Sequence, residues 1–227
     1  MKSLKFPNIK AVIFDLDGTL IRSSINFKQM KKSIIDLLVK NGLRYSLFSE
    51  SWKTTKIIEV GKKNLKDKGF NDNEIRKVLN SVTETMNNVE MENVSKTVQI
   101  EGARKTILAL RERGLRIGVL TRGCRRYANE ALKRTDMLKL IDVFLARDDT
   151  DRPKPDPHHL LKIIQSLNIK PEETIMVGDS TLDATCAVDA NVLFIGVLTG
   201  IANYEELNKA GSYIVLPNVT DIITILS

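Results

Sequence analysis

Short apolar runs alternate with helical segments along most of this chain, and this alternation restricts the fold more than any other feature. The apolar runs occupy residues 10–14, 115–120, 141–146, 174–177, 192–197 and, more weakly, 213–216. The helical segments between them occupy residues 103–113, 125–137, 157–167, 182–189 and 204–210. Strands that are apolar throughout and are separated by helices indicate a parallel sheet covered on both faces. We therefore predict an α/β fold with a doubly wound, Rossmann-like parallel sheet.

Residues 21–98 follow a different pattern, in which one helical segment succeeds another. Phe27, Met30, Ile34 and Leu38 fall on one helical face, and Asn41-Gly42 ends that segment. A second helical stretch carries apolar residues from Leu47 to Leu65 and stops near Gly69, and a third begins at Asn71 and Asp72. The sequence thus predicts an α/β core of residues 1–20 and 99–227, interrupted after its first strand by an all-helical domain of residues 21–98.

The composition, with 42% hydrophobic and 28% charged residues, is typical of a soluble globular protein. Only four apolar residues follow the basic N-terminus before Asp15, so we expect no signal peptide. The longest later apolar stretch, residues 192–202, is too short to span a bilayer. The two cysteines, Cys124 and Cys186, suit a reducing compartment. We expect a cytoplasmic protein that does not bind membranes.

Positive charge is concentrated in the predicted helical domain. Residues 21–98 contain 15 Lys and Arg against 9 Asp and Glu, whereas the rest of the chain contains 20 against 19. Solvated faces of lysine-rich helices are the simplest explanation. No dense basic run and no series of aromatic residues accompanies these charges, so nucleic acid is not an expected partner.

Polar residues that are suited to chemistry follow three of the predicted strands. They are Asp15 and Asp17 after the first strand, Thr121 and Arg122 after the second, and Gly178, Asp179 and Asp183 after the fourth. A further loop places Lys154 between Pro153 and Pro155, just before a helix. Because ligands of an open parallel sheet bind beyond the carboxyl ends of its strands, we expect these side chains to converge at one edge.

Four carboxylates in one pocket require compensating positive charge, because like charges at short range raise one another's pKa. Oxygen ligands of this kind favour Mg²⁺, and Lys154 supplies another positive charge. Gly18 would let the backbone approach a bound anion, and Thr19 and Thr121 offer hydroxyl donors. The set predicts phosphoryl transfer to or from a small phosphorylated metabolite.

These motifs resemble those of the haloacid dehalogenase superfamily. Asp15-Leu16-Asp17-Gly18-Thr19, Thr121, Lys154 and Gly178-Asp179-Ser180-Thr181-Leu182-Asp183 match its four motifs in order. The match covers the whole predicted core, and the helical insertion lies where the family has its C1 cap domain.

The resemblance implies a role for each matching residue. Asp15 would be the nucleophile that forms an aspartyl-phosphate, and Asp17 the general acid and base. Mg²⁺ would be held by Asp15, by the backbone carbonyl of Asp17 and by Asp179, with Asp183 binding through water or supporting the other ligands. Thr121 and Lys154 would hold the phosphate, beside Gly18 and Thr19. Arg122 stands where most relatives have a small or amide residue. Two alternatives remain for its side chain, namely contact with the substrate and a position on the rim of the pocket.

Asp17 also argues against carbon–halogen cleavage, because the true dehalogenases lack an acid at this position. The expected activity is hydrolysis of a small phosphomonoester. Among capped relatives, phosphoglycolate phosphatase-like enzymes are the most similar, so 2-phosphoglycolate is the first substrate hypothesis. A phosphomutase or phosphotransferase, which would need sugar-binding cap residues, and a non-catalytic phosphorylatable switch are the alternatives. The sequence does not indicate the oligomeric state.

Overall fold

The computed structural model describes residues 8–226 and divides the chain into two compact units. The first unit comprises Met1–Ser23 and Ser95–Ser227, and the second comprises Ser24–Val94. Residues 1–7 and residue 227, which the sequence assigns to the α/β core, lie outside the described part.

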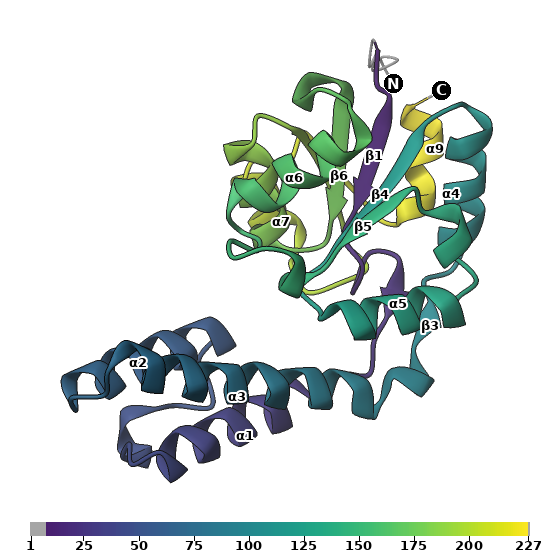
Figure 1. Cartoon of the computed structure of the whole chain (residues 1–227). Coiled ribbons are helices and arrows are strands. Elements are labelled where there is room, and N and C mark those ends of the chain that lie inside the picture. Colours follow the sequence, from purple (N-terminus) through teal and green to yellow (C-terminus); the bar gives the residue numbers. More distant parts are fainter. Residues whose placement is uncertain (1–7, 227) are drawn as a thin grey trace. The chain divides into compact units, whose positions relative to one another are not determined.

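A six-stranded parallel sheet forms the centre of the first unit (Figure 1). Its strands are β1 (Ala11–Phe14), β4 (Arg116–Leu120), β5 (Val143–Leu145), β6 (Thr174–Gly178), β7 (Leu193–Val197) and β8 (Ile214–Leu216). Their spatial order is β5-β4-β1-β6-β7-β8. The chain adds β4 and β5 on one side of β1 and then returns to add β6 on the other. The predicted doubly wound fold is confirmed, and β1 is the strand beside which ligands of such sheets bind.

Helices cover the sheet and bury its apolar strands. They are α4 (Ala103–Glu112), α5 (Arg125–Arg134), α6 (Pro157–Leu167), α7 (Thr181–Asp189), α8 (Tyr204–Lys209) and α9 (Ile222–Ile225). The helices α6 and α7 pack on each other and on the neighbouring strands, whereas α4 packs on β4 and α9. The segment predicted as a helix over 125–137 ends earlier, at Arg134, because Asp136 has a positive φ of 55° that ends the right-handed helix.

A two-stranded antiparallel ribbon joins the parts of the chain that flank the helical unit. It pairs β2 (Ile21–Arg22) with β3 (Val98–Gln99), and the Ile100 amide donates a hydrogen bond to the Leu20 carbonyl at 2.9 Å. No pattern in the sequence predicts this ribbon, because strands of two residues are too short to show a period. The ribbon belongs to the first unit, and the chain passes from one unit to the other at residues 23/24 and 94/95.

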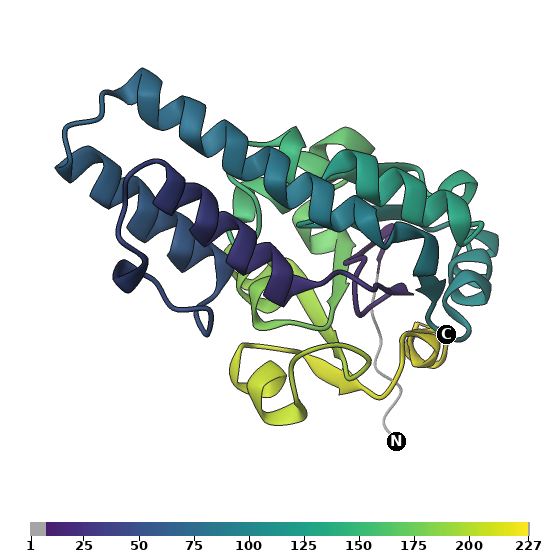
Figure 2. The ribbon, with the colours of Figure 1, turned by 90° about the horizontal axis from the view of Figure 1, so that it is seen from below.

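The second unit is all-helical, with α1 (Phe27–Lys40), α2 (Thr54–Asp67) and α3 (Asp72–Glu92) packed pairwise against one another (Figures 1 and 2). Asn71 caps α3 through a capping box with Glu74, as the sequence suggested. Two details of the prediction are wrong. Leu47 lies in a 3-10 turn (Tyr45–Leu47) before α2 begins, and Phe27, expected in the core, is 53% exposed.

The apolar stripes of these helices form a separate buried cluster. It includes Met30, Ile34, Leu38, Ile57 and Leu65, and Trp52 packs against it. Within residues 8–226, no helix combines the length and apolarity needed to cross a bilayer.

This cluster gives a direct test of the helical unit, because Trp52 is the single tryptophan of the chain. Ile57→Ala removes a fully buried side chain and should lower the free energy of unfolding by about 2–5 kcal/mol. Urea unfolding followed by Trp52 fluorescence measures this change. Thr55→Ala, at an exposed position of the same helix, should leave the midpoint nearly unchanged. Equal midpoints for the two variants would contradict the described core.

Candidate active site

The ammonium group of Lys154 lies between two buried carboxylates at the end of β1. Its Nζ donates hydrogen bonds to Asp15 Oδ1 and to Asp183 Oδ1, each at 2.6 Å. Lys154 and Asp183 are each 1% exposed, and Asp15 is 7% exposed. Burial disfavours the ammonium form, but the two carboxylates outweigh it and raise the pKa of Lys154. The lysine therefore stays charged in a site that excludes most water.

Backbone pairing explains how these side chains come together. Asp15 directly follows β1, and its amide donates to the Val177 carbonyl of β6 at 2.8 Å. Asp183 lies in the first turn of α7, where it completes a capping box with Ser180. Lys154 is 139 residues away from Asp15 in the sequence and is supplied by the loop before α6. Parallel strands that end at one edge thus bring distant residues to the same point.

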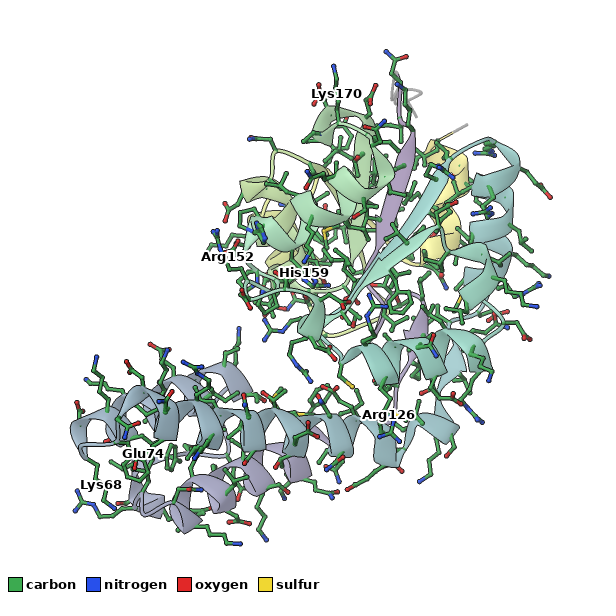
Figure 3. All side chains as sticks on the ribbon, viewed as in Figure 1. Lys68, Glu74, Arg126, Arg152, His159 and Lys170 are labelled. Atoms are coloured by element: carbon green, nitrogen blue, oxygen red, sulfur yellow. The ribbon has the colours of Figure 1, made fainter. Side chains whose placement is uncertain are left out.

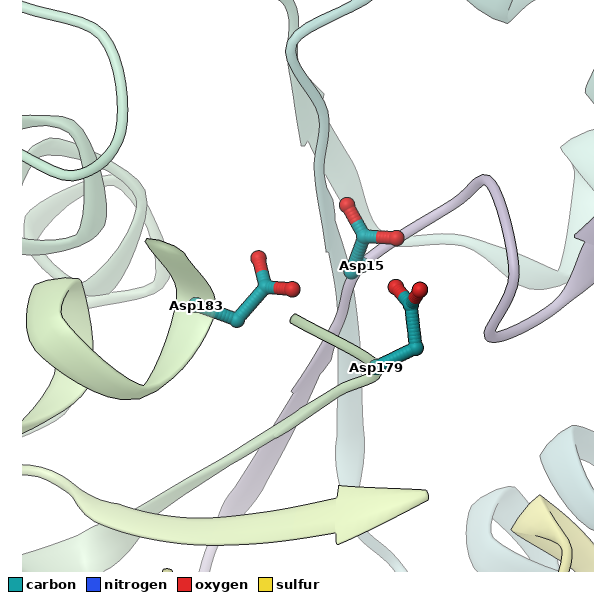
Figure 4. Close-up of side chains that lie close together, drawn as sticks. All are labelled: Asp15, Asp179 and Asp183. Atoms are coloured by element: carbon teal, nitrogen blue, oxygen red, sulfur yellow. The ribbon is translucent and has the colours of Figure 1, made fainter. Parts of the chain in front are cut away.

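A third buried acid, Asp179, completes a group of three carboxylates (Figure 4). Asp15, Asp179 and Asp183 each offer a carboxylate oxygen, and these three oxygens lie within 4.8 Å of one another. Burial first, and the charge of Asp183 second, raise the pKa of Asp179 to about 6. Burial likewise raises the pKa of Asp15 well above its usual value, and Lys154 opposes this shift. Three carboxylates facing one ammonium carry excess negative charge, and their all-oxygen donor set fits Mg²⁺.

The carboxylate of Asp179 is enclosed by two glycines. A Cβ atom on Gly18, whose φ is 90°, would lie 2.6 Å from Asp179 Oδ2, and a Cβ atom on Gly200 would lie 1.8 Å from the same oxygen. The amide of Ile201 donates to Asp179 Oδ2 at 2.8 Å, and Thr199 Oγ1 donates to the Gly18 carbonyl at 2.6 Å. The loop after β7 therefore fixes both Asp179 and the turn that follows β1.

The backbone of Lys154 is held by a buried histidine. His159 Nδ1 accepts a hydrogen bond from the Lys154 amide at 3.3 Å, so its Nε2 carries the proton and donates to the Ala146 carbonyl at 3.2 Å. Burial, followed by the charge of Lys154, lowers the pKa of His159 to about 4. His159 is therefore neutral at physiological pH and lies within the sheet unit (Figure 3). It acts as a structural support for the lysine.

Arg122 also contacts this loop, because its Nη1 donates to the Lys154 carbonyl. Arg147 Nη1 in turn donates to the Arg122 carbonyl at 2.7 Å. Burial and the nearby Arg147 lower the pKa of Arg122. No ion pair joins Arg122 to a carboxylate in the part of the chain that the structure describes. A half-buried guanidinium thus lies next to the lysine loop without a carboxylate of its own.

The two candidate threonines differ in their surroundings. Thr121 is 1% exposed at the carboxyl end of β4, and its Oγ1 accepts the Gly123 amide at 3.0 Å, so its own proton is available for donation. Thr19 is fully buried, and its Oγ1 has no hydrogen-bond partner among the described residues. Both hydroxyls can therefore donate to a further acceptor.

Asp17 does not join the group of three carboxylates. Its Oδ1 instead accepts a hydrogen bond from the Tyr127 hydroxyl at 2.5 Å. Asp15 and Asp17, two residues apart in one turn, therefore have different surroundings: one carboxylate contacts an ammonium, and the other a phenol.

Three residues of this site were not among the site residues predicted from the sequence, namely Tyr127, His159 and Gly200. Gly200 could have been found, because it follows β7 as Asp179 follows β6, and the same strand-end rule applies. Tyr127 and His159 carry no such signal, since each lies on an apolar helical face that sequence alone assigns to the core.

A family model described as haloacid dehalogenase-like hydrolase matches residues 12–197 of this chain. The pyrophosphatase PpaX of Bacillus mycoides is 28% identical over 220 residues, which cover 96% of this chain and 97% of that protein.

Solved structures agree with this match. A hydrolase from Pseudomonas syringae superposes with a TM-score of 0.66 at 21% identity, covering 95% of this chain and 96% of that one. A predicted phosphoglycolate phosphatase from Haemophilus somnus superposes with a TM-score of 0.68 at 18% identity, covering 98% of this chain and all of that one. At these identities the two structures establish the fold alone. The matched span contains Asp15, Asp17, Thr121, Lys154, Asp179 and Asp183, and the chain belongs to the haloacid dehalogenase-like hydrolase family.

Proposed function

We propose that this protein is a Mg²⁺-dependent phosphatase that hydrolyses a small phosphate compound through an aspartyl-phosphate at Asp15. The observation that carries the proposal is the position of the buried Lys154 ammonium between Asp15 and Asp183, with Asp179 beside them. A carboxylate that attacks a phosphate anion needs cations close to both groups, because the two negative charges repel each other. The arrangement supplies one cation and an oxygen site for another.

Asp15, Asp179 and Asp183, with the backbone carbonyl of Asp17, would hold the metal ion. A bound Mg²⁺ would keep the carboxylates ionised and offset the negative charge of the phosphoryl group. The sequence predicts a cap domain of residues 21–98, and we propose that the helical unit Ser24–Val94 is this cap domain. The remaining unit would be the catalytic core.

The reaction assigned to these residues has two steps. First, a carboxylate oxygen of Asp15 bonds to phosphorus, the bond to the leaving oxygen breaks, and Asp17 gives its proton to that oxygen. Second, Asp17 takes a proton from water, the water oxygen attacks phosphorus, and Asp15 leaves as a free carboxylate with release of inorganic phosphate. Lys154 and the Thr121 hydroxyl hold the phosphoryl oxygens in both steps, with Gly18 and Thr19 as further contacts.

Replacement of the nucleophile tests the mechanism. Asp15→Asn should lower kcat for p-nitrophenyl phosphate at least ~10³-fold, because an amide cannot form the phosphoenzyme. The wild-type protein should release phosphate with Mg²⁺ and stop with EDTA, and Asp189→Asn, at an exposed position at the end of α7, should behave as wild type. Full activity of Asp15→Asn would refute the aspartyl-phosphate route. Transfer to sugar acceptors faster than hydrolysis would favour a phosphotransferase, and a long-lived phospho-Asp15 without turnover would favour a switch.

The metal site has its own test in Gly200. In Gly200→Ala the added methyl group displaces the Asp179 carboxylate, so the Mg²⁺ concentration for half-maximal activity should rise about tenfold or more. Ile201→Ala is the matched control, because Ile201 is 84% exposed and contacts Asp179 only through its amide. An unchanged Mg²⁺ requirement in Gly200→Ala would show that Asp179 does not hold the metal.

Arg122 favours a substrate that carries a second anionic group. Among residues 8–226 the Arg122 guanidinium forms no ion pair with a carboxylate, and its position beside the lysine loop suits a second phosphate or a carboxylate of the substrate. Relatives named pyrophosphatase make inorganic pyrophosphate the first candidate, and 2-phosphoglycolate, suggested by the family resemblance, is the second.

A substrate panel separates these possibilities. Arg122→Met should raise KM about tenfold for whichever of these two substrates is preferred, because each carries a second anionic group beside the phosphoryl group that is attacked. It should change kcat for p-nitrophenyl phosphate little, because the aryl group carries no such second anion. Arg126→Met, on the exposed face of α5, should change neither constant. An equal loss of kcat with every substrate would mean that Arg122 only supports the Lys154 loop.

A further inference from the structure

Tyr127 is a buried polar side chain that the reaction scheme above leaves unused. It lies in the first turn of α5, immediately after the turn that carries Thr121, and its side chain is fully buried. Its amide donates to Cys124 Sγ, which caps the helix, at 3.4 Å. Helix capping and burial therefore fix the place of the tyrosine relative to β4.

The hydroxyl of Tyr127 contacts the proposed acid and base of the reaction. It donates to Asp17 Oδ1 at 2.5 Å, across 110 residues of sequence. A phenol is protonated at neutral pH, so the tyrosine is the donor and the carboxylate the acceptor. A short hydrogen bond to a charged acceptor is stronger than one between neutral groups and limits the orientations of the carboxylate.

The ring of Tyr127 is itself immobilised by the turn that holds Thr121. A Cβ atom on Gly123 would lie 2.7 Å from Tyr127 Cδ1, so the ring packs directly on the glycine backbone. The same Gly123 donates its amide to Thr121 Oγ1 at 3.0 Å. The Gly123 backbone therefore contacts both the Tyr127 ring and the Thr121 hydroxyl, so the ring cannot shift toward this turn without displacing it.

We propose that Tyr127 is a positioning residue that holds the Asp17 carboxylate in the orientation from which it exchanges its proton with the leaving oxygen and with water. The inference rests on the proposed function and adds a residue to it. Tyr127 keeps its own proton and transfers nothing.

The experiment compares two aryl phosphates whose leaving groups differ in their need for a proton. Phenolate is a strong base, with a conjugate-acid pKa of about 10, so phenyl phosphate depends on Asp17, whereas nitrophenolate is a much weaker base. Tyr127→Phe should lower kcat/KM for phenyl phosphate about tenfold and for p-nitrophenyl phosphate less than about threefold. KM should change little for either compound.

Two further variants make the result specific. Tyr213→Phe, at a half-exposed position at the amino end of β8 and thus at the opposite edge of the sheet, should match the wild-type protein. In an Asp17→Asn background, Tyr127→Phe should cause no additional loss, because a residue that acts only through Asp17 has nothing left to position. Thermal unfolding of each variant reports whether the fold is retained.

Each other outcome overturns the proposal. Equal losses for both substrates would mean that Tyr127 only supports the packing of α5. An unchanged or increased kcat/KM would mean that the hydrogen bond holds Asp17 away from the substrate. A further loss in the Asp17→Asn background would mean that Tyr127 acts elsewhere. A wild-type protein without turnover of any substrate would refute the proposed function, and the role of Tyr127 with it. An active wild-type protein with an unaffected Tyr127→Phe variant would refute only the role of Tyr127.

Discussion

The buried ion pairs of Lys154 with Asp15 and Asp183 are the interaction on which the arrangement of this site depends. An ammonium that is 1% exposed is strongly unfavourable unless carboxylates surround it, and the carboxylates are equally unfavourable without it. The three residues come from β1, from the loop before α6 and from the first turn of α7. Their mutual dependence therefore ties three segments of the sheet unit to one point. Removal of one partner would leave a buried charge without compensation.

Around these ion pairs, the supporting contacts are made largely by backbone groups and glycines. Gly18 and Gly200 leave room for the Asp179 carboxylate, and Gly123 leaves room for the Tyr127 ring. His159, neutral because burial lowers its pKa to about 4, holds the Lys154 backbone without adding a charge. His159 and the three glycines thus fix these side chains without adding charge to the site, whereas Arg122 and Arg147 support the Lys154 loop as charged groups.

The two aspartates of the turn after β1 illustrate how environment separates similar groups. Asp15 lies beside an ammonium and two other carboxylates, whereas Asp17 accepts a hydrogen bond from a phenol. A nucleophile needs nearby positive charge, and an acid–base group needs a fixed orientation with a proton to exchange. The structure supplies each aspartate with the partner that suits its proposed role. Their separation by a single residue in sequence would not by itself distinguish them.

The sequence by itself determined the parallel sheet, the helical insertion and the residues at the strand ends. These follow from local periodicity and from the rule that ligands bind at carboxyl ends of parallel strands, so Asp15, Thr121, Asp179 and Asp183 could be placed at one edge before any coordinates. Tertiary structure alone decided that Leu47 precedes α2, that Phe27 is exposed, and that a short two-stranded ribbon flanks the helical unit in the sequence. It also decided the partners of Asp17, Lys154 and Asp179, namely Tyr127, His159 and Gly200. Such contacts join residues far apart in the chain, and their geometry depends on packing that no local pattern records.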